Sequence, residues 1–117
     1  PTFAPPVATS EWKLNDNAAS TTVIDSAGTN TGTSIQNTSV MSTAGKINTA
    51  FNFNGTSDYV YTTTQYANPQ TFSISAWFKT STASGKKIVG FEYSRTGTTS
   101  SYYDRSIYIG TDGKLHV

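Results

Sequence analysis

The acidic and amide side chains of the loop at residues 25–33 are the first candidates for chemistry. Asp25 begins this loop, Asn30 follows five residues later, and serine, alanine, glycine and threonine lie between them. Calcium takes six to eight oxygen ligands and combines carboxylates with loop carbonyls. Asp25 and Asn30 with the carbonyls between them supply half of such a shell, and Asp58 adds a carboxylate. The pattern predicts a calcium site at Asp25, Asn30 and Asp58; the alternative is that these side chains only form turns with the backbone.

Aromatic side chains are the second candidates, because an exposed ring can stack on the apolar C–H face of a sugar. Trp77, Tyr59 and Tyr61 alternate with the apolar positions of their segments, and Tyr102 and Tyr103 stand together in a long polar loop. From this set we expect Tyr102, Tyr103 and Trp77 to bind a ligand. The alternative is that another strand, loop or partner covers the rings, since a buried tryptophan is ordinary.

The pattern of carboxylates argues against catalysis. No two of them occur at the close spacing that would place both on one face of a strand, and His116, the only histidine, has no partner that the sequence identifies. The chain has no cysteine, and it lacks the Gly-x-Ser-x-Gly motif that positions a nucleophilic serine. The sequence therefore predicts a protein that is not an enzyme.

Composition narrows the class of protein further. Only 13% of the 117 residues are charged, against about 25% in an average soluble protein. Serine, threonine, asparagine and glycine take their place, which disfavours helices and is common in extracellular β-proteins. The net charge is +1 with scattered basic residues, so no nucleic-acid surface is indicated, and no apolar run approaches the roughly 20 residues of a membrane span.

The elements that must position these side chains are β-strands. Phe72, Ile74, Ala76 and Phe78 alternate with polar residues and Trp77, and a period of two is typical of a strand. The same alternation flanks Asn54-Gly55, a strong hairpin-turn signal, and a second turn signal occupies residues 111–114. Strands are expected at about 11–14, 50–53, 58–61, 72–79, 87–92, 106–109 and 114–117. The residues expected to form a common core are Phe51, Phe53, Val60, Phe72, Ile74, Ala76 and Phe78.

Taken in order, six short segments resemble the laminin-G-like branch of the concanavalin A-like lectin/glucanase superfamily, in its bacterial and phage form. They are residues 12–14 (WKL), 25–30 (DSAGTN), 44–46 (AGK), 50–60 (AFNFNGTSDYV), 72–79 (FSISAWFK) and 108–115 (YIGTDGKL). The resemblance implies an all-β fold, an antiparallel two-sheet jelly-roll sandwich, with calcium often held in such loops. It also implies that glucanase activity is absent, because the carboxylate cluster of the superfamily's enzymes is missing.

The resemblance also indicates that the sandwich is incomplete. Family members continue with a Trp-His strand and a Tyr-Val-Asp-Gly hairpin that residues 1–117 lack. We therefore expect residues 1–9 to be an extended linker or a processed N-terminus, and residues 10–117 to be the N-terminal portion of the jelly roll. Strands after about residue 105 are expected to be completed by further polypeptide or a neighbouring subunit.

Two functions are consistent with these patterns. The first is a non-catalytic extracellular recognition module, at a cell surface or on a virion, that binds a glycan or a protein surface through its loops. The alternative is a structural subunit of a virion, fibre or surface assembly, completed by strands from another chain.

Overall fold

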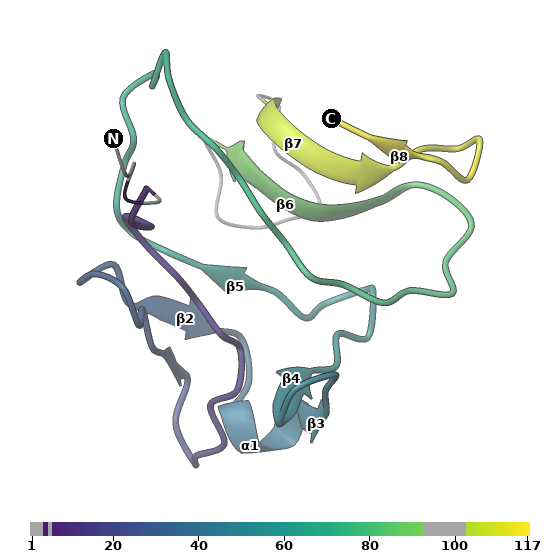
Figure 1. Ribbon diagram of the computed structural model, residues 1–117. Helices are drawn as coiled ribbons and strands as arrows, with labels where there is room; N and C mark the ends of the chain where they lie inside the picture. The colour runs from purple at the N-terminus through teal and green to yellow at the C-terminus, as the bar shows by residue number, and fades with distance from the viewer. Residues whose placement is uncertain (1–3, 5, 93–102) are drawn as a thin grey trace. The chain divides into compact units, whose positions relative to one another are not determined.

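The computed structural model describes residues 4, 6–92 and 103–117, and it divides the chain into two compact units (Figure 1). The first unit is Pro1–Tyr66 and the second is Ala67–Val117. Each unit has its own sheet of three antiparallel strands, and the first adds a two-stranded hairpin. The two units are described separately below.

The sheet of the first unit joins strands that are distant in the sequence. Strands β1 (Thr22–Val23), β2 (Gly32–Ser34) and β5 (Val60–Tyr61) pair in the order β1-β2-β5, all antiparallel. The strand expected at residues 11–14 contributes only one isolated bridge, between Trp12 and Asp25. Sheet formation here depends on bringing residues 60–61 back to residues 33–34, a pairing that local alternation cannot reveal.

A single helical turn and a hairpin close the other side of the first unit. The helix α1 (Thr38–Met41) leads directly into β3 (Ser42–Ala44), which pairs with β4 (Thr49–Phe51). Asn48 turns the chain between these strands with a φ of 58°, a left-handed conformation that asparagine tolerates well.

The core of the first unit is small and combines aliphatic with aromatic side chains. Val23, Met41 and Phe51 are buried together, and Trp12, Leu14 and Val60 pack against them partly buried. Burial of one such side chain stabilises a fold by about 1.5–3 kcal/mol. These contacts join β1, α1 and β4, so the core fastens the short elements to one another.

The second unit contains the longest strands. Strands β6 (Lys86–Glu92), β7 (Tyr103–Ile109) and β8 (Leu115–His116) form an antiparallel sheet in that order. The expected turn at residues 111–114 is confirmed: it connects β7 to β8, and Gly113 has the left-handed φ of 74° that favours glycine. Ile109 is the buried hydrophobic residue of this sheet.

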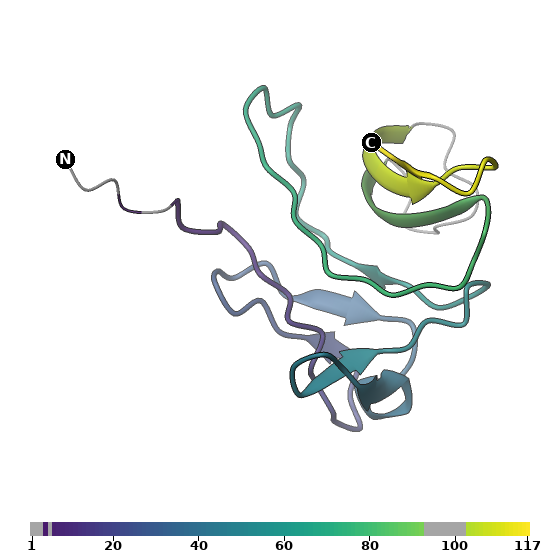
Figure 2. The same ribbon diagram turned by 45° about the vertical axis from the view of Figure 1, so that its right-hand side comes forward.

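Two of the expected strand arrangements are wrong. Residues 72–79 form no strand in the structure, and Figure 2 shows them within a long connection drawn without an arrow. The strands on either side of Asn54-Gly55 do not pair with each other, because β4 pairs with β3 and β5 pairs with β2. Asn54-Gly55 still turns the chain, but the strands before and after it form their backbone hydrogen bonds with other strands.

The expected common core is correspondingly wrong in most of its members. Phe51 is buried and Val60 is half-buried, whereas Phe53, Phe72 and Phe78 are each more than 40% exposed. Ala76 is also exposed, and Ile74 is half-buried. The physical reason is that an alternating segment buries its apolar face fully only where a complete layer opposes it. Here Phe72 and Ile74 line an open hollow with Ile107 of β7, and the Arg105 guanidinium lies over the Phe72 ring.

The all-β class is confirmed at the level of antiparallel sheets with one helical turn. Among the residues that the structure describes, no helix has the length and apolar character that crossing a membrane requires.

Candidate functional site

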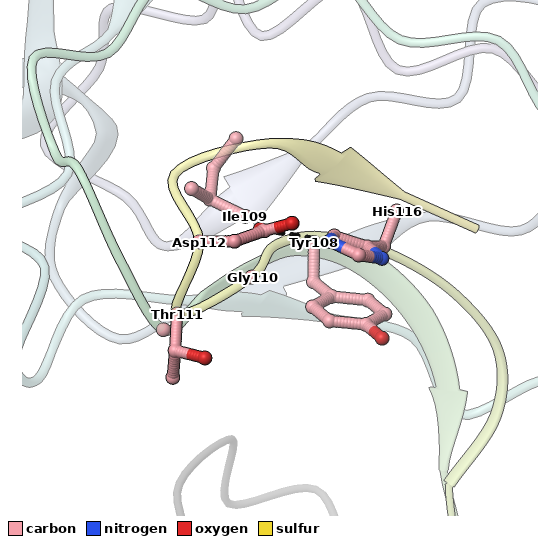
Figure 3. Close-up of a pocket in the computed structure, with 7 residues that line it drawn as sticks. Tyr108, Ile109, Gly110, Thr111, Asp112 and His116 are labelled. Atoms are coloured by element: carbon pink, nitrogen blue, oxygen red, sulfur yellow. Dashed lines mark hydrogen bonds and ion pairs between the residues drawn. The ribbon is translucent and has the colours of Figure 1, made fainter.

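An open hollow beside the β7–β8 hairpin gathers the most varied chemistry in the second unit. Its volume is about 370 Å³, and its lining includes Tyr108 from the end of β7, Thr111 and Asp112 from the turn, and His116 from β8. Figure 3 shows the imidazole of His116 beside the Tyr108 ring, with the Asp112 carboxylate directed toward it. An aromatic ring, a carboxylate, an imidazole and a hydroxyl therefore line one concavity.

The register of the hairpin brings the two rings together. Tyr108 and His116 are directly opposite each other in the β7–β8 pair, so their side chains emerge on the same face of the sheet. Their ring centroids are 5.2 Å apart and the ring planes differ by 19°, which is a stacked arrangement. His116 thus covers part of one face of Tyr108, while 40% of Tyr108 remains exposed.

Asp112 fixes the orientation of the imidazole. Nε2 of His116 lies 2.9 Å from Oδ1 of Asp112, and the backbone N–H of Lys114 donates to the same oxygen at 3.0 Å. The hydrogen bond with His116, followed by the one from Lys114, lowers the pKa of the Asp112 carboxyl. The carboxylate is therefore ionised throughout the neutral pH range and presents a fixed negative charge to the hollow.

Gly110 provides the space that this pair needs. A Cβ atom at position 110 would lie 2.5 Å from Nε2 of His116 and 2.7 Å from Oδ1 of Asp112. Contacts below 3.0 Å force something to move, so a side chain at this position would displace the pair. The backbone N–H of Gly110 also donates to the Lys114 carbonyl at 2.8 Å, which closes the turn.

The Asp25 carboxylate accepts hydrogen bonds from its own loop and from the segment before it. Oδ1 accepts hydrogen bonds from the backbone N–H groups of Glu11 (2.8 Å), Ala27 (3.1 Å) and Gly28 (2.9 Å). Oδ2 accepts the backbone N–H of Asn30 at 3.0 Å. Asp25 is only 7% exposed. Its buried carboxylate therefore holds the loop at residues 27–30 and the backbone of Glu11 together by hydrogen bonds.

These hydrogen bonds determine the ionisation of Asp25. Burial by itself raises the pKa of this carboxyl. Hydrogen bonds from the backbone N–H groups of Glu11, Gly28 and Ala27 outweigh burial and hold the pKa well below its ordinary value. The carboxylate thus keeps its charge, and the surrounding N–H groups compensate for it.

The side chains of the other two expected calcium ligands make separate hydrogen bonds, although the backbone N–H of Asn30 joins that residue to Asp25. Nδ2 of Asn30 donates to the Tyr66 hydroxyl at 3.0 Å. Asp58 accepts Nε2 of Gln36 at 2.6 Å and the backbone N–H of Asn54 at 3.1 Å. The hydrogen bonds that the structure describes give Asp25 and Asp58 no common partner.

This donor set does not fit a calcium ion. Three backbone N–H groups donate to Oδ1 of Asp25 and one donates to Oδ2, and these N–H groups occupy lone pairs that a cation needs. Across the described ranges, no three side chains of the histidine, cysteine or carboxylate type form a group that could hold a metal. The turn-forming alternative accounts for Asp25, and calcium binding stays a prediction.

Of the three expected aromatic ligand residues, the structure describes the side chain of Trp77 alone. Trp77 is 95% exposed in the connection before β6. Tyr103 begins β7 and pairs through its backbone with Glu92, whereas Tyr102 lies outside the described residues. Ligand binding by these three residues stays a prediction.

Tyr108, Asp112 and His116 are the residues that sequence reasoning missed. The signal was present in the turn at residues 111–114, because a hairpin closed there places residues 108 and 116 opposite each other. It also places a histidine four residues after an aspartate, across a tight turn. Reading His116 with the turn, rather than alone, would have found its partner.

Similarity to known proteins adds nothing to the geometry of the hollow. No family model matches the chain, and no curated protein or solved structure matches it either. The resemblance to laminin-G-like domains therefore depends on the sequence motifs.

Proposed function

We propose that this chain is a non-catalytic extracellular recognition module of the laminin-G-like, jelly-roll type, and that it binds a glycan in the hollow beside the β7–β8 hairpin. The observation that carries this proposal is the exposed Tyr108 ring next to an ionised carboxylate, both fixed by one turn. The low content of charged residues supports the proposal, because it is common in extracellular β-proteins.

The lining of the hollow suits a neutral sugar. The ring of Tyr108 offers an apolar surface to the C–H face of a pyranose, with a polar hydroxyl at its edge. Within the described residues, both hydrogen bonds to the Asp112 carboxylate go to Oδ1, which leaves Oδ2 to accept a sugar hydroxyl. The fixed negative charge disfavours acidic sugars by like-charge repulsion.

Glycan-array binding followed by calorimetric titration of the bound sugar tests the proposal. Tyr108→Ala should weaken binding at least tenfold, which corresponds to about 1.4 kcal/mol, and Tyr108→Phe should retain most of it. Trp77→Ala is the matched control, because it removes an exposed ring outside the hollow. Binding that survives Tyr108→Ala, or that depends only on Trp77, would contradict the assignment of the hollow.

A structural subunit of a virion, fibre or surface assembly is the second candidate. The observation that favours it is the unpaired alternating segment at residues 72–79, which strands from another chain would complete. Stable assemblies without affinity for any glycan would support this function over the first.

A further inference from the structure

Residues 71–79 have the sequence pattern of a strand and remain without a strand partner in the part of the chain that the structure describes. The described hydrogen bonds involve none of their backbone N–H or C=O groups. No residue of this segment has a positive φ, and the trace in Figure 2 runs as a long connection without an arrow. The segment is therefore compatible with pairing to another strand.

Most side chains of this segment are exposed, although the Arg105 guanidinium lies over the Phe72 ring, 5.1 Å from its centroid. Trp77 is 95% exposed, and Phe72 and Phe78 are each 46% exposed. Soluble proteins usually protect unpaired strands with charges or prolines. Here Lys79 is the only charged residue of the nine, and none is a proline.

We propose that residues 71–79 pair antiparallel with the same residues of a second copy of the chain, about a two-fold axis at Ser75. In this register Phe72 lies opposite Phe78, and Ile74 lies opposite Ala76. Because the apolar positions are symmetric about residue 75, all four form one continuous face in both copies. The interface is isologous, as in most homodimers, and it does not depend on glycan binding.

The sequence selects this register over its neighbours. An antiparallel shift that changes the parity places each apolar residue opposite a polar position or Trp77. Centres at residue 74 or 76 keep the parity, but they leave Phe78 opposite Gln70 or Phe72 opposite Thr80. Only the centre at Ser75 pairs all four apolar residues with one another, and it places Lys79 opposite Thr71, so no like charges meet.

The composition of residues 71–79 also favours a second copy of the chain as the pairing partner. An edge that selects a charged partner peptide needs complementary charges along its length, and residues 71–78 carry none. The segment supplies identical apolar and small polar side chains to both sides of a symmetric pair. The two copies of Trp77 then lie over the small Ser73 side chain of the opposite strand, on the other face.

A cysteine at the two-fold centre gives the sharpest test, because the natural chain has no cysteine. Directly opposed residues in an antiparallel pair have Cα atoms about 4.5–5.5 Å apart, which is within disulfide range. Ser75→Cys should therefore form a disulfide-linked dimer on mild oxidation. The matched control is Ser81→Cys, also exposed, whose two copies would lie about 40 Å apart at the usual rise per residue.

Sedimentation velocity of the unmodified protein provides the second measurement. We expect a reversible dimer that dissociates on dilution without any sugar present. Ile74→Lys should weaken this dimer at least tenfold, because it places charge on the paired apolar face, whereas Ser81→Lys, at an exposed position outside residues 71–79, should leave it within about threefold. Circular dichroism verifies that both variants remain folded.

Three outcomes would overturn the proposal. The first is a monomer at every concentration, which would mean that a different molecule occupies the segment. The second is equal crosslinking of the Ser75→Cys and Ser81→Cys variants. The third is a dimer that the Ser75→Cys variant does not trap, which would place the interface or the register elsewhere.

Discussion

The two units of the chain use their side chains in opposite ways. In the first unit, Val23, Met41 and Phe51 are buried together, and the Asp25 carboxylate is fully engaged by backbone N–H groups. In the second unit, Tyr108, Phe72 and Trp77 are exposed on or near a three-stranded sheet whose β6–β7 pairing contains two register shifts. The unit with the shorter strands holds its loops in place from within, whereas the unit with the longer strands presents aromatic rings to the solvent. Strand length alone is therefore a poor guide to how deeply a part of this protein buries its side chains.

The largest expected difference between the units lies in their cores. Met41→Ala should destabilise the protein by about 2–5 kcal/mol, the usual cost of removing a buried methionine side chain. Leu115→Ala in the second unit should change stability by less than about 0.5 kcal/mol, because Leu115 is largely exposed. Urea denaturation of both variants measures the contrast, and similar losses would mean that the second unit buries more than the structure indicates.

A smaller loss is expected when the space under the imidazole is filled. Gly110→Ala should cost at most about 1 kcal/mol, because the new methyl group displaces the outer ends of the partly exposed His116 and Asp112 side chains. It should also abolish sugar binding in the hollow. Gly85→Ala is a useful comparison, since no atom lies within 4 Å of a Cβ there, although its φ of 63° still strains any L residue. Titration and thermal melts of both variants separate the loss of the hollow from backbone strain.

The contribution of Asp25 should depend on pH. Its pKa is lowered in the folded state, so its contribution to stability is present above the ordinary pKa of about 3.9 and is lost as the pH falls further. Asp25→Asn should therefore lower the melting temperature at pH 7 and narrow the gap to the unmodified protein toward pH 2. Melting curves across this range measure the gap, and a gap that does not change with pH would refute the role of the charged form.

The smallest expected effect is that of calcium. Because N–H groups surround the Asp25 oxygens, millimolar calcium should leave the melting temperature within about 1 °C of its value in EDTA. Ligands that bind only the native state stabilise it in proportion to RT ln(1 + [L]/Kd). A calcium-dependent rise that Asp25→Ala removes would instead establish the site expected from the sequence.

Alternation and turn signals predicted strands of the second unit's sheet. They did not predict which strands pair in the first unit. The strand expected at 87–92 is β6, and the turn at residues 111–114 joins β7 to β8, because alternation and turn chemistry act over a few residues. In contrast, the Asn54-Gly55 turn is surrounded by strands that pair with residues 33–34 and 42–44. The alternation of apolar and polar residues at 72–79 is typical of a strand, but it does not show which strand would pair with it.

The candidate site shows the same division. Asp25 and Asn30 have residue types that bind calcium, but which atoms face the carboxylate depends on the backbone path of Glu11 and residues 27–30. Tyr108 and His116 lie eight positions apart, and only the register of the hairpin brings their rings together. Residue types indicate which interactions are possible, and the backbone path determines which of these interactions form.

The buried hydroxyl of Thr38 should slow the opening of the loop at residues 17–20. Thr38 is fully buried, and its Oγ1 accepts the backbone N–H of Ala18 at 3.0 Å while donating to the Ala18 carbonyl at 3.2 Å. The backbone N–H groups of Thr38 and Ser39 donate in turn to the carbonyls of Ser20 and Ala18. The loop at residues 17–20 cannot separate from α1 without breaking these hydrogen bonds together. The amide hydrogens that donate in this network, those of Ala18, Thr38 and Ser39, should therefore exchange with solvent more slowly than those of the two-residue strand β8, since protection follows cooperative opening rather than the presence of a strand.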